Sequence, residues 1–118
     1  MTENTQRELQ DLLTCMSNVQ LTHLLVEIEN GNIEPRSYWM VSQDCGCLYG
    51  NAVWRKGDDW EAIVRKADKL KIALTGIQVS QTPLEEELAE QVRYGESHND
   101  NYFLREVHLA AREELATR

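Results

Sequence analysis

The chain is poor in cross-linking residues and has no long apolar run. It holds three cysteines among 118 residues. An odd number cannot all pair, and Cys45 and Cys47 are too close in sequence for an ordinary disulfide, so we expect reduced thiols and no secreted disulfide scaffold. No window approaches the ~18 apolar residues of a membrane span, and residues 1–8 lack the cationic and apolar segments of a signal peptide. These absences predict a cytoplasmic protein that does not bind membranes.

Familiar catalytic motifs are also missing. The sequence has no glycine-rich phosphate loop, no Gly-x-Ser-x-Gly and no His-Glu-x-x-His. A cysteine nucleophile needs a histidine base, and His23 lies in an apolar helical run where a base is not expected. The glutamates at 85–87 are better explained by the dipole at a helix start than by catalysis. We therefore predict a protein that is not an enzyme, with no cofactor and no metal.

Positive charge is scarce at both ends of the chain. Residues 1–35 carry six acids and one base, residues 81–118 carry nine acids and four bases, and the middle segment carries five acids and seven bases, for a net charge of −8. Direct binding to nucleic acid needs a clustered positive face and is not expected. A basic protein partner fits the acidic ends, although the same charges also keep a protein soluble.

Apolar residues recur with helical spacing along most of the chain. Residues 9–16 and 21–28 each follow an i, i+3, i+4, i+7 pattern, with Ser17-Asn18 as a break and Gly31 as a stop. Asp58 or Asp59 caps a third clear helix, which ends before Gly76. Its predicted apolar face comprises Trp60, Ile63, Val64, Ala67, Leu70 and Leu74.

The second half adds two more helices. Residues 82–85 form a capping box with proline at the first helical position, and the last helix contributes apolar side chains up to Leu115. These include Phe103, Leu104, Val107, Leu109 and Ala111. Residues 72–80 alternate well enough for a hairpin, but an isolated hairpin is marginal, so we favour a helix end followed by an extended link. The sequence predicts a mainly α protein, a single-domain bundle of five to six helices spanning residues 1–118.

The stretch from 38 to 54 concentrates the chemically special residues. It contains two of the three cysteines and two of the three tryptophans. We take Tyr38, Trp39, Cys45, Cys47, Tyr49 and Trp54 as the candidate binding residues. Zinc is not favoured, because structural sites usually place two to four residues between paired cysteines. Trp39 is expected in the core, with an exposed binding anchor as the competing interpretation.

The order of several short motifs is similar to that in small uncharacterised proteins of phages and other mobile elements. The shared features are the aromatic pair Tyr38-Trp39, the segment 44–52 with its cysteines and glycines, and the later Thr-Pro-Leu-Glu helix start. Those proteins have a wider cysteine spacing than this chain. The resemblance implies an accessory protein of a mobile element and carries no assigned activity.

Three functions remain open from the sequence. The leading hypothesis is a non-enzymatic interaction module, an acidic inhibitor of a nucleic-acid-binding host factor. The alternatives are a zinc- or thiol-dependent regulator that uses Cys45 and Cys47, and a small-molecule binder with a pocket of Tyr38, Trp39, Tyr49 and Trp54. Spare apolar helix faces also suit a homodimer.

Overall fold

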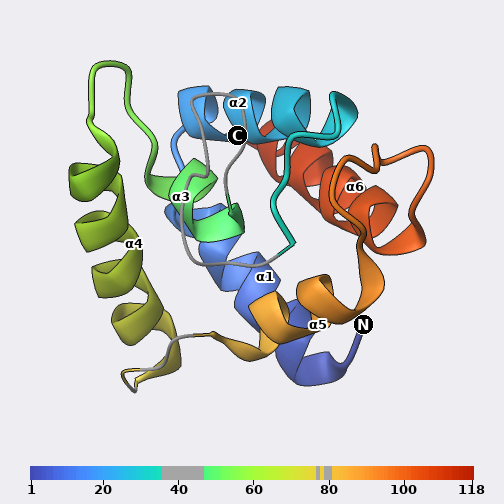
Figure 1. Ribbon diagram of the computed structural model, residues 1–118, viewed down its shortest axis with the longest axis horizontal. Helices are drawn as coiled ribbons and strands as arrows, with labels where there is room; N and C mark the ends of the chain where they lie inside the picture. Colours follow the sequence, from blue (N-terminus) through green and yellow to red (C-terminus); the bar gives the residue numbers. More distant parts are fainter. Residues whose placement is uncertain (36–46, 77, 79–80) are drawn as a thin grey trace.

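The part of the chain that the structure describes contains six helices joined by loops. The computed structural model describes residues 1–35, 47–76, 78 and 81–118, so the predictions on Tyr38, Trp39 and Cys45 lie outside it. No strand occurs within these ranges, which confirms the mainly α fold and the expected number of helices. The helices are α1 (Glu3–Cys15), α2 (Asn18–Glu29), α3 (Leu48–Val53), α4 (Trp60–Thr75), α5 (Pro83–Gln91) and α6 (Tyr102–Ala116) (Figure 1).

Helix α1 is the centre of the arrangement. It packs against α3, α4, α5 and α6, while α2 packs against α3 and α6. In Figure 1, α4 forms one side of the molecule, α6 the other, and the short α3 lies between them. The end of the chain returns to α1, because the Arg118 guanidinium donates to the carbonyl of Leu13 at 3.0 Å. Helix α1 is therefore held by α3, α4, α5, α6 and the last residue of the chain.

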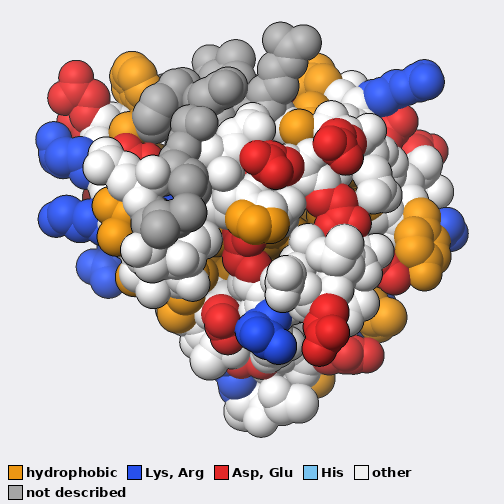
Figure 2. Space-filling model, turned by 90° about the horizontal axis from the view of Figure 1, so that it is seen from below, with side chains coloured by type: hydrophobic (Ala, Val, Ile, Leu, Met, Phe, Trp, Pro, Cys, Tyr) orange, Lys and Arg blue, Asp and Glu red, His pale blue; other side chains and the backbone are white. Residues whose placement is uncertain are grey.

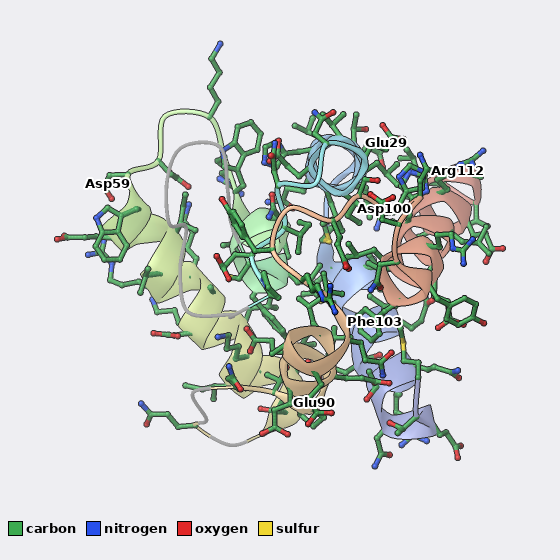
Figure 3. The ribbon with its side chains drawn as sticks, turned by 45° about the vertical axis from the view of Figure 1, so that its right-hand side comes forward. Glu29, Asp59, Glu90, Asp100, Phe103 and Arg112 are labelled. Carbon is green, nitrogen blue, oxygen red and sulfur yellow. The ribbon has the colours of Figure 1, made fainter. Side chains whose placement is uncertain are left out.

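Local capping chemistry explains where most helices start. Ser17 is the N-cap of α2 and Thr82 is the N-cap of α5, and each forms a capping box with the residue three positions later. Asp59 accepts the N–H of Ala62 at the start of α4, and Gly76 ends that helix in the left-handed conformation. Each cap satisfies backbone groups that would otherwise lack partners. The start of α4 at Asp59 and that of α6 near Phe103 lie well apart in the molecule (Figure 3).

The core is built mainly from leucines on the inner faces of the helices. Burial of each such side chain stabilises the fold by about 1.5–3 kcal/mol relative to exposure. The fully buried side chains, with 0–1% exposure, include Leu12, Leu13, Leu21, Leu24, Ile28, Leu48, Leu84, Leu88, Phe103, Leu104 and Val107. They come from five of the helices and form one continuous cluster. The chain therefore has a single hydrophobic centre within its described part.

Two side chains assigned to apolar faces from the sequence are exposed instead. Trp60 is 56% exposed, because it is the first residue of α4 and the buried stripe of that helix begins at Ile63. Leu109 is 55% exposed, because it lies about 200° around α6 from the buried Val107. The helical choice for residues 72–75 is correct, since α4 continues to Thr75. The predicted link beyond it falls largely outside the described residues.

Candidate functional site

Tyr49, a predicted binding residue, belongs to a buried polar cluster. Its hydroxyl donates to Oε2 of Glu8 at 2.7 Å, and Oε1 of Glu8 accepts the Leu84 N–H at 3.0 Å. Tyr49 is fully buried and Glu8 is 8% exposed. Burial, followed by the contact with Glu8, raises the pKa of Tyr49 far above its usual value. One carboxylate thus joins α1, α3 and the first turn of α5.

A buried ion pair lies beside this carboxylate. Lys71 Nζ is 3.1 Å from Oε1 of Glu85, and the two side chains are 4% and 0% exposed. The same glutamate oxygen accepts the Thr82 N–H, which completes the capping box of α5. Lys71 Nζ also lies 5.6 Å from the centre of the Tyr49 ring. Removal of either charge would leave the other buried without this partner, which is more costly than the loss of an exposed pair.

Cys47 lies at the edge of the same cluster and has a capping role. It precedes α3, and its sulfur accepts the Gly50 N–H at 3.1 Å. Burial raises the pKa of the Cys47 thiol to about 11, and the carboxylate of Glu85 adds to the effect. A protonated, 2% exposed thiol is a poor nucleophile and a poor metal ligand. Among the described residues, no three His, Cys, Asp or Glu side chains are placed to hold a metal ion.

The cluster links four helices and offers no exposed chemistry among its described members. Sequence reasoning missed Glu8 and Lys71, and explained Glu85 by the helix dipole alone. A signal was present, because Glu8 lies four residues before Leu12 and Lys71 four residues after Ala67, on the buried faces of their helices. A charged residue at such a position predicts a buried partner. The role of the buried cluster is structural, because its contacts fix the position of α1 against α3, α4 and α5.

Trp54, another predicted binding residue, has different neighbours from Tyr49. Its ring stacks on His23, with centroids 4.0 Å apart and planes inclined by 8°. Burial lowers the pKa of His23, although Glu27 and a hydrogen bond with Asn51 act in the opposite direction. Trp54 is partly exposed and lines a groove, whereas Tyr49 lies in the core. The predicted aromatic pocket therefore does not include an accessible Tyr49.

A second pair of stacked rings joins α6 to the loop before it. His98 and His108 have centroids 4.3 Å apart, and His108 Nε2 lies 2.9 Å from Oε1 of Glu29. The Nδ1 atom of His98 is buried, and no described residue hydrogen bonds to it. Glu29 and Asp100 mark this region, where the end of α2 meets α6 (Figure 3). The pair contributes to the packing of α2 on α6.

An open groove between α1 and α6 has an apolar floor and an acidic rim. We call it the acidic groove. Its volume is about 270 Å³. Leu9 and Ala110 form its floor, and Glu106, Leu109 and Glu113 come from α6. Met1, Gln6 and Gln10 complete the lining, and none of these described residues is Lys or Arg.

Comparisons with protein families, curated proteins and solved structures found no match to this chain. None of the described helices is long and apolar enough to span a membrane.

Proposed function

We propose that the protein acts without catalysis, by binding a basic amphipathic segment of a protein partner in the acidic groove. The observation that carries this proposal is the exposed Leu109, 55% accessible, between two carboxylates on the rim of an apolar groove. The sequence resemblance to phage and mobile-element proteins suggests a host partner. A nucleic-acid-binding host factor, whose basic surface the protein would occupy, is the proposed class.

The outer face of α6 has the pattern of a helix-binding surface. Tyr102, Glu106, Leu109 and Glu113 follow a spacing of i, i+4, i+7 and i+11, which places them in one stripe. Tyr102 is 65% exposed, so the stripe alternates apolar and acidic contact points. A partner helix recognised in this way would carry apolar anchors at similar spacing. Lysine or arginine beside those anchors would face the two carboxylates.

Charge favours a basic partner over a second copy of the chain. A symmetric dimer through this groove would place the same patch on both sides of the interface. Glu106 and Glu113 would then face the same carboxylates of the other copy, which costs free energy when they are desolvated. A basic segment would replace that repulsion with attraction. The proposed occupant is therefore a basic helix.

The proposal is tested with two synthetic helical peptides of equal length, one of leucine and lysine and one of leucine and glutamate. We expect the lysine peptide to bind, with amide shift changes in NMR spectra that cluster on Gln6, Gln10 and Leu109. The glutamate peptide should not bind. Higher salt should weaken binding, because the rim charges are exposed to solvent.

Matched variants separate the groove from general acidity. Leu109→Ser should lower the affinity for the lysine peptide by about tenfold or more, which is the loss expected when one buried leucine is removed. Val26→Ser, a similar change at a residue 43% exposed on α2, should have no effect. If Leu109→Ser and Val26→Ser bind the lysine peptide with equal affinity, the proposal is contradicted. Concentration-dependent dimerisation that is lost in Leu109→Ser would instead assign the groove to a second copy.

A further inference from the structure

A basic groove lies between the end of α1, the start of α2, α3 and α4. We define it by Arg55, Lys66 and Lys69 over a floor that includes Leu70 and Ala73, with Cys15 at its edge. Its volume is about 520 Å³, and none of its described lining residues is Asp or Glu. An adjoining hollow of about 590 Å³ shares Arg55 and Cys15 with it. That hollow adds Trp54 and Lys56.

The charge of this groove contrasts with that of the protein, which is −8. Lysine and arginine side chains gather at the edge of the molecule over α4, whereas acidic side chains are spread over the middle of the same face (Figure 2). Lys66 pairs with Asp58 at 2.6 Å. No ion pair with a described residue engages Arg55 or Lys69. These two cations therefore remain available for an anion.

Helix geometry places the cations on one side of an apolar floor. Lys66, Lys69 and Ala73 are spaced i, i+3 and i+7 on α4, so they share a face with Leu70 beside them. Arg55 approaches from the segment that follows α3. Like charges brought together repel each other, and a bound dianion would relieve that repulsion. Trp54, whose ring stacks on His23, also lines the adjoining hollow together with Arg55.

We propose that the basic groove binds a small organic phosphate of mononucleotide size. The phosphate lies against Arg55 and Lys69, because guanidinium binds phosphate through paired hydrogen bonds and ammonium adds a point charge. The aromatic part of the ligand occupies the adjoining hollow beside Trp54. The volume of the groove falls within the range of small-molecule sites. This site is separate from the acidic groove, and its test does not depend on the protein partner.

AMP is the probe, with adenosine and inorganic phosphate as its two parts. Binding is measured by titration of the intact protein and by protection of Cys15 from iodoacetamide. Alkylation is read on the Cys15 peptide by mass spectrometry, so that other cysteines do not contribute. We expect AMP to protect Cys15 and to bind at least about tenfold more tightly than either part, because both halves of the site contribute.

Two single variants and one control assign the effect to this groove. Arg55→Gln and Lys69→Gln should each weaken AMP binding by about tenfold, the loss expected for one charge-assisted contact. Arg7→Gln makes the same charge change at a side chain 70% exposed on α1, outside the groove, and should leave binding unchanged. Circular dichroism of each variant checks that the fold is retained.

Four results would overturn the proposal. If millimolar AMP does not protect Cys15 from iodoacetamide, the basic groove is not an AMP site. If inorganic phosphate binds as tightly as AMP, the basic groove is a simple anion site. If adenosine binds as tightly as AMP, the charges of the groove have no role in binding. A thymidine oligonucleotide that binds far more tightly than AMP would assign the groove to a nucleic-acid strand.

Discussion

Replacement of Glu8 by glutamine tests the buried cluster most directly. The change keeps the shape of the side chain, but it turns one of the two acceptor oxygens into an N–H donor. In the native protein both oxygens accept, one from Tyr49 and one from the Leu84 N–H. Glutamine can satisfy one of these donors and must present its own N–H group to the other. The conflict arises inside the protein, where Glu8 is 8% exposed.

The expected cost follows from two opposing effects. Hydrogen bonds to a charged group contribute about 1.5–3 kcal/mol each, and in Glu8→Gln both contacts become neutral while one native donor faces an N–H group. A neutral amide is cheaper to bury than a carboxylate, which offsets part of that loss. We therefore expect Glu8→Gln to reduce the free energy of unfolding by about 1–3 kcal/mol. The midpoint in urea should fall by about 1 M, with the slope unchanged.

The assay is urea denaturation followed by circular dichroism, with Glu3→Gln as the matched control. Glu3 lies on the same helix, is 90% exposed, and pairs loosely with Arg7. Its replacement should change stability by less than about 0.5 kcal/mol. Tyr49→Phe is then made in the wild type and in Glu8→Gln. The difference between its two effects is the coupling free energy of Tyr49 and Glu8, which should be about 1 kcal/mol or more. If Glu8→Gln is no more harmful than Glu3→Gln, the cluster does not hold α1 in place.

Two further predictions concern single residues in the fold. We expect the difference in the free energy of unfolding between the wild type and Cys47→Ala to change by about 1 kcal/mol against the wild type between pH 8 and pH 10. Urea denaturation at the two pH values measures it. Burial raises the pKa of Cys47 from 9.0 to about 11, so the unfolded thiol ionises first and this stability is lost as pH rises. Gly31→Ala should lower the thermal midpoint more than Gly76→Ala. Both glycines have positive φ, but only at Gly31 would a new Cβ lie 2.6 Å from the carbonyl oxygen of Gly95; equal midpoints would contradict this reasoning.

Local signals made most helix boundaries predictable from the sequence. The capping box at Thr82, the cap at Asp59 and the stop at Gly76 all act within four residues of their own position. Hydrophobic spacing also assigned the buried faces of α1 and α2 correctly. Capping and periodicity depend on neighbours in the chain, and a single sequence displays those neighbours directly.

The buried cluster could not be read in the same way, because its partners are distant in sequence. Glu8 bonds to residues 41 and 76 positions away. The pattern shows a charge on a buried face, but the partner depends on how the helices pack. The prediction that Leu109 belongs to the core is wrong for a related reason, because its angle around α6 turns this apolar side chain toward solvent. As an exposed leucine, it instead lines the acidic groove beside Glu106 and Glu113.

The two grooves share α1, and this bears on how their variants should be interpreted. Leu9 and Gln10 from the first part of α1 line the acidic groove, while Cys15 at its end lines the basic groove. Glu8 fixes that helix, so its replacement could disturb both sites through the fold. Leu109 and Lys69 take no part in the cluster, and each can report on its own groove. Coupling between the two ligands would require that α1 occupy two positions with different affinities. If α1 is held in one position, as its buried contacts indicate, the two sites should bind independently.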